Sequence, residues 1–168
     1  MNRYTLAVLV RNQFGVLNRL TSMFRRRQFN ISSITASETE SADFSRITFS
    51  FDGEEDGKQQ LVNQLYKLPD VCSIKELTNE NSVSCELMLI KMKNDPAVRA
   101  DIYAAAEAFK AETINYSRES FVLRLIGDST KMDEFILLMK DYTILEFCRT
   151  GTASLEKGSA TLRQTMNL

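Results

Sequence analysis

The strongest constraint on the fold is a hydrophobic pattern that occurs twice along the chain. In the first half, stretches with the two-residue period of strands or the 3.6-residue period of helices follow one another in the order strand, helix, strand, strand, helix, strand. The stretches expected to form these elements are 3–10, 16–27, 29–35, 44–52, 58–68 and 71–77. Within 44–52, polar Arg46 and Thr48 alternate with apolar Ile47 and Phe49, as in an antiparallel strand with one buried face.

The second half repeats this order with little sequence identity to the first. The strands expected there are 85–93, 112–117, 121–127 and 143–148. Asp95 followed by Pro96 predicts an N-cap and the first position of one helix, and Asp128 or Ser129 is expected to cap the other. Residues 150–168 are expected to form a loop and a partly ordered tail.

The repeated order predicts an α+β fold of two ferredoxin-like βαββαβ domains. We expect the first domain at 1–78 and the second, with the tail, at 83–168. In each domain the helices would cover one face of the sheet and leave the other face and the edge strands open. A second copy of the chain is the simplest cover for such surfaces, so a homodimer is expected.

The composition excludes several classes of functional site. The chain has no histidine, which excludes Ser-His-Asp and Cys-His nucleophile systems and histidine-bound metals. Its three cysteines are widely spaced, so we predict no metal site and expect reduced thiols in a cytoplasmic protein. The 21 basic and 22 acidic residues leave no basic excess, which predicts no nucleic-acid partner. Residues 1–10 resemble neither a signal peptide nor a membrane span, so no membrane association is expected.

The stretch 12–31 contains the candidate binding residues. Backbone N–H groups at the start of its helix favour a carboxylate, and the amide of Asn12 can serve the ammonium and carboxylate of an amino acid. Asn30, after the same helix, could complete a polar rim around an apolar ligand side chain. The full candidate set is Asn12, Gly15, Val16, Leu17, Asn30 and Ile31. A purely structural interpretation is also open: Asn12 as a helix cap, Gly15 as a turn residue and Asn30 as a left-handed residue after the helix.

The same stretch resembles a known family. Residues 12–19 and 24–34 are similar to the pattern N-x-x-G-V/A-L-x-R followed by F-x-x-R-x-x-N-I-x-S-L/I, found in the N-terminal ACT domain of acetohydroxyacid synthase (acetolactate synthase) regulatory small subunits. The resemblance continues in order at 45–48, 64–71, 86–91 and 150–158. Gln28 stands where family members commonly have glycine.

The resemblance implies a chain without catalytic residues or a cofactor of its own. Such a subunit binds a catalytic large subunit, which holds thiamine diphosphate, magnesium and FAD, and raises its activity. It also confers feedback inhibition by valine or a related branched-chain amino acid, bound between the ACT domains of two small subunits. Carried over to matching positions, the resemblance assigns effector binding to the six candidate residues named above.

Two other hypotheses remain at this point. The chain could be a free-standing tandem ACT-like sensor of an amino acid that acts on a transcription regulator. It could also be an enzyme that uses carboxylates on an open sheet face, although the sequence shows no convergent acid and base pair.

Overall fold

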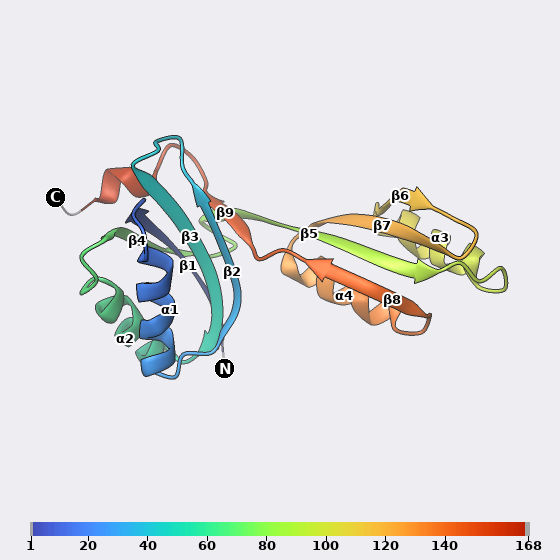
Figure 1. Ribbon diagram of the computed structural model, residues 1–168, viewed down its shortest axis with the longest axis horizontal. Helices are drawn as coiled ribbons and strands as arrows, with labels where there is room; N and C mark the ends of the chain where they lie inside the picture. Colours follow the sequence, from blue (N-terminus) through green and yellow to red (C-terminus); the bar gives the residue numbers. More distant parts are fainter. Residues whose placement is uncertain (1, 167–168) are drawn as a thin grey trace. The chain divides into compact units, whose positions relative to one another are not determined.

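The computed structural model describes residues 2–166, which form two compact units (Figure 1). One unit extends to Val83 and resumes at Gly151, and the other consists of Ser84–Thr150. We call them the first and the second unit. Because the chain leaves the first unit and later returns to it, the second unit is an insertion in the first.

The first unit contains the sheet and helices expected from the first half of the sequence. Its elements are β1 (Asn2–Arg11), α1 (Val16–Arg26), β2 (Ile31–Glu38), β3 (Phe44–Gly53), α2 (Glu55–Leu65) and β4 (Val71–Leu77). The strands form an antiparallel sheet in the order β2-β3-β1-β4, with both helices on one face (Figure 1). On α1, Val16, Leu20 and Phe24 recur at every fourth position and are buried in the core, which fixes the face that α1 turns to the sheet.

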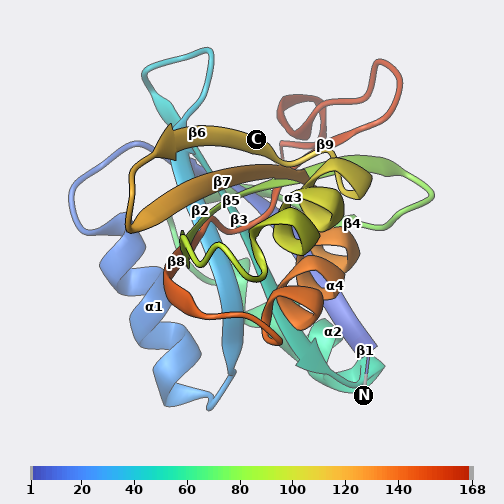
Figure 2. The ribbon, with the colours of Figure 1, turned by 90° about the vertical axis from the view of Figure 1, so that its right-hand side faces the viewer.

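The second unit repeats the arrangement. Its elements are β5 (Ser82–Lys93), whose first two residues still belong to the first unit, α3 (Arg99–Ala108), β6 (Glu112–Tyr116), β7 (Ser120–Gly127), α4 (Ser129–Met139) and β8 (Ile144–Arg149). The strand order is β6-β7-β5-β8, again antiparallel, and α3 and α4 share one face (Figures 1 and 2). The core is closed by alternate residues of β5 and β7, such as Ile90 and Leu123, against Phe135 of α4. The predicted α+β fold with two ferredoxin-like βαββαβ patterns is therefore confirmed.

Of the two helix starts predicted for the second unit, the structure confirms one. Asp128 is the N-cap of α4, and its Oδ1 accepts the Lys131 N–H at 2.8 Å. The predicted start of α3 at Pro96 is wrong, because α3 begins at Arg99. The Asp95 carboxylate instead accepts the Ala97 N–H at 3.0 Å, which closes a turn two residues on and delays the helix.

The C-terminal tail is more ordered than expected and belongs to the first unit. It forms β9 (Ala153–Glu156) and the 3-10 helix η1 (Leu162–Thr165). Leu162 packs with Ala7 and Leu9, the residues of β1 that point away from α1 and α2. The expected domain boundary, which placed the tail in 83–168, is therefore wrong for residues 151–166, which group with the first unit and contribute Leu162 to its core.

Polar contacts also hold the tail to the first unit. Ser73 and Thr165 share a hydrogen bond of 2.6 Å between their hydroxyl groups, and Lys75 forms a 3.1 Å ion pair with Glu156. At Gly151 a Cβ would lie 2.5 Å from the Thr35 hydroxyl oxygen, so only glycine fits where the chain re-enters the unit. The sheet face that was expected to need a second copy is thus partly covered by the chain itself.

Replacing Leu162 with alanine is expected to destabilise the first unit by about 2 kcal/mol, because it removes a buried side chain from this cover. Hydrogen exchange at the amides of β1 and β4 measures the free energy of opening of the first unit alone, and so reports this destabilisation. The matched control is Leu155→Ala on the same tail, where the side chain is 64% exposed and the expected change is below about 0.5 kcal/mol. Equal changes in both variants would show that the tail does not contribute to the core.

Candidate functional site

The loop Arg11–Gly15 joins β1 to α1 and ends in an uncapped helix start. Gly15 occupies the N-cap position with φ of 82°, in the left-handed region that favours glycine. No side chain caps α1, and its first turn contains no acidic residue. The positive end of the helix is therefore available to an anionic group of a ligand.

The Asn12 side chain does not cap α1, so this part of the structural interpretation is wrong. Its Nδ2 donates to Glu38 Oε1 at 3.2 Å and to the Ala42 carbonyl at 3.0 Å, and its Oδ1 accepts from Ser45 Oγ at 3.1 Å. These bonds connect the loop to the β2–β3 hairpin. Asn12 is thereby positioned beside the helix start with its amide orientation fixed by three partners.

A pocket of about 210 Å³ lies between this loop, the start of α1 and the hairpin. We call it the α1 pocket; its lining residues are Val10, Arg11, Asn12, Gln13, Val16, Leu17, Ala36, Ser37, Glu38, Ser45 and Ile47. Val10, Val16 and Ile47 are buried and give it an apolar floor, while the amide, hydroxyl and carboxylate groups make a polar rim. A small molecule with an aliphatic side chain and charged ends suits such a lining.

An ion pair that the sequence analysis missed clamps the loop. Arg19 Nε and Nη2 each lie 2.7 Å from Asp70 Oδ2, and Asp70 is buried. The carbonyl of Asp70 accepts the Arg11 N–H at 2.9 Å, and the Arg19 N–H donates to the Gly15 carbonyl at 2.9 Å. One aspartate thus holds both ends of the loop. Arg19 is part of the family-like pattern, but nothing in the spacing indicates that Asp70 is its partner.

Asn30 and Ile31 lie away from the α1 pocket. They stand at the start of β2, beyond the C-terminal end of α1, and an 11-residue helix is about 16 Å long. Ile31 lines a different hollow of about 460 Å³ with Phe24, Phe29 and Ile34. Of the six candidates, a single chain brings together Asn12, Val16 and Leu17 in the pocket, with Gly15 adjacent, and leaves Asn30 and Ile31 apart. The expected rim with Asn30 does not form within one chain.

Gln28, the departure from the family pattern, adopts the conformation that a glycine would take. Its φ is 58°, and the Phe29 N–H donates to the Phe24 carbonyl at 3.0 Å in the helix-ending turn. The left-handed residue that ends α1 is therefore Gln28 and not Asn30, which corrects the structural interpretation of Asn30. α1 of this chain thus ends in a left-handed residue, although glutamine is less suited to that conformation than glycine.

Gln28→Gly is expected to stabilise the first unit by about 0.5–1 kcal/mol, because glycine removes the steric cost of a left-handed side chain. Hydrogen exchange of the first-unit core measures the change. The control, Gln59→Gly inside the exposed face of α2, should destabilise the same unit by about 1 kcal/mol. Destabilisation by both substitutions would contradict the left-handed assignment at Gln28.

Asp70→Asn is expected to loosen the Arg11–Gly15 loop and to lower the stability of the first unit by about 1 kcal/mol. The value is modest because the Arg19 side chain is 44% exposed and water screens the pair. Faster hydrogen exchange at the amides of 12–17 is the direct measure. Glu112→Gln, which removes the ion pair with Arg124 at the surface of the second unit, is the matched control and should leave these amides unchanged. Unaltered exchange in both variants would show that the Arg19–Asp70 pair does not restrain the loop.

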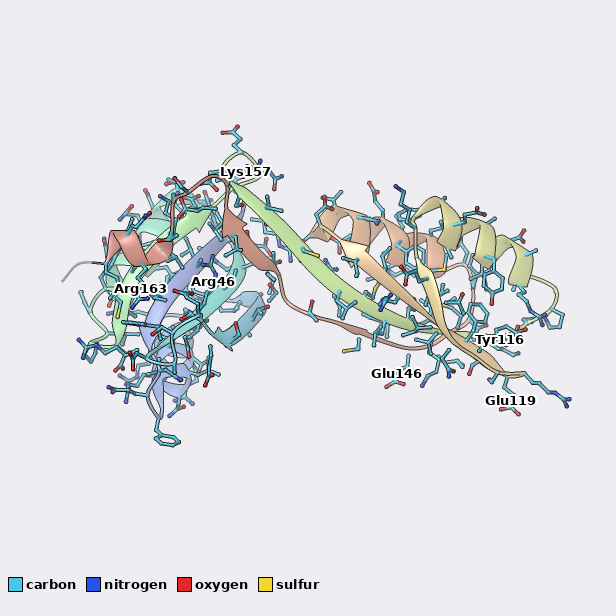
Figure 3. The ribbon with its side chains drawn as sticks, turned by 90° about the horizontal axis from the view of Figure 1, so that it is seen from above. Arg46, Tyr116, Glu119, Glu146, Lys157 and Arg163 are labelled. Atoms are coloured by element: carbon cyan, nitrogen blue, oxygen red, sulfur yellow. The ribbon has the colours of Figure 1, made fainter. Side chains whose placement is uncertain are left out.

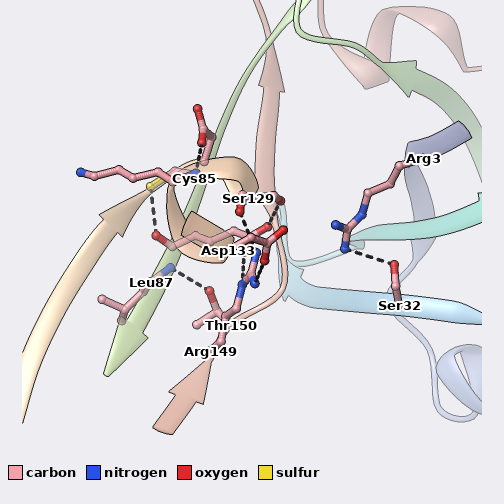
Figure 4. A network of polar contacts seen from close by, with 11 residues as sticks. Arg3, Ser32, Cys85, Leu87, Ser129, Asp133, Arg149 and Thr150 are labelled. Carbon is pink, nitrogen blue, oxygen red and sulfur yellow. Dashed lines mark hydrogen bonds and ion pairs between the residues drawn. The ribbon is translucent and has the colours of Figure 1, made fainter. Parts of the chain in front are cut away.

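The second unit contains a polar cluster around Glu86. Its carboxylate accepts from Arg149 Nε at 2.6 Å and from the hydroxyl of Ser129, while Arg149 also pairs with Asp133 (Figure 4). Glu86 is buried, and the cluster ties α4 to β5 and β8. Because its members bond to one another, it acts as a structural connection and offers no poised acid and base pair.

Further features of the described residues bear on the class of protein. Within residues 2–166 no three His, Cys, Asp or Glu side chains gather as they would around a metal ion. None of the helices in the same range has the length and apolar character needed to cross a bilayer. Cys72, Cys85 and Cys148 are free thiols.

Comparison with known proteins covers both units. A family model described as an AHAS small subunit-like ACT domain matches residues 6–73, and one described as the small subunit of acetolactate synthase matches 85–158. The chain is 40% identical to the probable acetolactate synthase small subunit of Archaeoglobus fulgidus, over 94% of this chain and 98% of the relative. It is 42% identical to the acetolactate synthase small subunit of Bacillus subtilis, over 92% and 90%. The chain belongs to the acetolactate synthase small-subunit family.

The structure of this acetolactate synthase small-subunit family member resembles a solved relative. The small subunit from Thermotoga maritima superimposes with a TM-score of 0.85 at 31% identity, covering 95% of this chain and 100% of that one. The matched ACT domain, 6–73, contains the Arg11–Gly15 loop, α1 and Asn30. The resemblance inferred from the sequence is thus confirmed.

Proposed function

We propose that this chain is the regulatory, non-catalytic subunit of acetolactate synthase in branched-chain amino acid biosynthesis. It binds the catalytic large subunit, raises its activity and confers feedback inhibition by valine or a related amino acid. The observation that carries the proposal is the α1 pocket, where an apolar floor meets an uncapped helix start and the fixed amide of Asn12. Membership of the small-subunit family identifies acetolactate synthase as the enzyme that the chain would regulate.

The pocket offers a separate partner for each part of the amino acid. The carboxylate is placed at the start of α1, where free N–H groups and the helix dipole favour negative charge. The ammonium faces Glu38 and the remaining lone pair of Asn12 Oδ1. The aliphatic side chain packs on Val16 and Leu17, and Leu17 is 46% exposed in the free chain and so has surface left to bury.

A homodimer would bring Asn30 and Ile31 of one copy to the α1 pocket of the other. β2 is an edge strand of the first sheet, and its end, Ser37 and Glu38, lines the α1 pocket. If two copies pair antiparallel through β2, the start of one strand lies beside the end of the other. Asn30 and Ile31 of one copy would then complete the pocket of its partner. The half-exposed Ile34 in the middle of β2 supports this edge as the contact.

The regulatory effect would follow from linkage. An effector bound between two ACT domains favours one arrangement of the pair, and the catalytic subunit binds or is activated better by the other. Thiamine diphosphate, magnesium and FAD belong to the catalytic partner in this proposal, and the small subunit holds none of them. We place the complex in the cytoplasm, where free thiols such as Cys85 and Cys148 persist.

Calorimetric titration of the purified chain with valine, leucine and isoleucine tests the effector site. Saturable heat is expected with at least one of them, and Gly15→Asp should weaken that affinity at least about tenfold, because a second carboxylate would stand beside that of the ligand. Asn12→Ala should weaken it similarly by removing the amide. Gln60→Asp adds the same charge on the exposed side of α2, away from the pocket, and should bind like the unaltered chain. Unchanged binding in Gly15→Asp and Asn12→Ala would remove the effector role from this pocket.

Association with the catalytic subunit separates this proposal from the free-standing sensor. Mixing the chain with its acetolactate synthase large subunit should give a complex on size exclusion and raise the rate of acetolactate formation. Valine should lower that rate in the complex with the unaltered chain and lose this effect with Gly15→Asp. Valine binding without any association would favour the sensor.

A further inference from the structure

A second and larger pocket lies on the face of the first sheet that points away from α1 and α2. Its volume is about 510 Å³, and its walls come from β1, from the β2–β3 hairpin and from the C-terminal tail. We call it the tail pocket. Leu9, Leu155 and Leu162 give it an apolar surface, and Arg46 and Arg163 approach from two sides (Figure 3).

Arg46 is the cation of this pocket whose charge is least compensated. Its Nη2 donates to the Ser154 carbonyl at 2.6 Å, whereas its Nε is buried and has no acceptor among residues 2–166. Within the same residues, no carboxylate oxygen lies within 4.0 Å of its guanidinium. Burial lowers the pKa of Arg46, and the fields of Glu156 and Glu40 oppose that shift only from a distance. A partly buried guanidinium without a carboxylate partner is a favourable place for an anion.

The acidic residues around the pocket already have partners. Glu156 forms its ion pair with Lys75 at 3.1 Å, Glu40 lies 3.7 Å from Arg163, and Glu38 accepts from Asn12. Arg163 also lies over the ring of Phe44, with its guanidinium carbon 5.4 Å from the ring centre. In the described part of the chain, Arg46 is therefore the arginine of this pocket without a paired carboxylate, and it lies next to aliphatic surface.

We propose that the tail pocket binds a small organic acid, whose carboxylate pairs with Arg46 and whose aliphatic body lies on Leu9 and Leu162. The site is separate from the α1 pocket and needs no ammonium group. The two pockets share Ser37 and Glu38 as a common wall, and Glu38 bonds to Asn12. An occupant of the tail pocket would therefore alter effector affinity, a consequence that rests on the proposed function.

The probe for this site is 3-methylbutanoate, which is valine without its ammonium group. Nuclear magnetic resonance of the full chain, at constant ionic strength, should show amide shifts at 155–163 that saturate with a dissociation constant of about 1–10 mM, as expected for so few atoms. The same shifts should occur in Gly15→Asp, because the α1 pocket is not involved. The corresponding amine, 2-methylpropan-1-amine, lacks the carboxylate and should give none.

Arg46→Gln should weaken this binding at least about tenfold. Because Arg46 also holds the tail through Ser154, a second variant is needed: Ala160→Trp keeps that bond and fills the pocket, and should abolish the shifts. Arg26→Gln, an exposed arginine on α1, is the charge-matched control. Absence of saturable shifts, or shifts that persist in both pocket variants, would overturn the proposal. If the unaltered chain does not bind valine, the proposed function is refuted, while this test of the tail pocket still stands.

Discussion

The burial of β1 on both faces is the constraint on which the first unit depends. Leu6, Val8 and Val10 face α1 and α2, while Ala7 and Leu9 face the other way and are equally buried. A strand that is apolar on both faces needs cover on both, and two helices can supply only one layer. The tail supplies the other, which is why the chain returns to the first unit after completing the second. The insertion of one unit into the other is thus a consequence of how this strand is covered.

The same strand positions the Arg11–Gly15 loop. β1 is paired along both edges, with β3 and with β4, so its last residue, Arg11, has a fixed place. From there the backbone turns through a left-handed Gly15 into α1, and Asp70 restrains both sides of that turn. The loop is therefore held by the sheet and by one ion pair more than by its own residues. Such a loop can present backbone N–H groups in a constant geometry, which lowers the ordering cost of binding.

The sequence was sufficient for the elements and their order because hydrophobic period is a local property. The alternation in β3 and the four-residue spacing of Val16, Leu20 and Phe24 each appear in a short window. The same is true of the Asp128 cap. The tail could not be assigned this way, since its few apolar residues, such as Leu162, show no period and find their partners about 150 residues earlier in β1. The Arg19–Asp70 pair was missed for the same reason.

The candidate site shows a further limit of reasoning from a motif. The family-like pattern includes Asn12 and Asn30 within one short stretch, yet α1 holds them at opposite ends, so closeness in sequence does not give closeness in space. In the proposed dimer the motif describes two half-sites, each completed by the other copy. Effector binding would then require the two ACT domains to hold one arrangement, and its affinity would measure the stability of that arrangement. A site divided in this way would link ligand binding to quaternary structure, because the partner copy would complete the pocket that each chain begins.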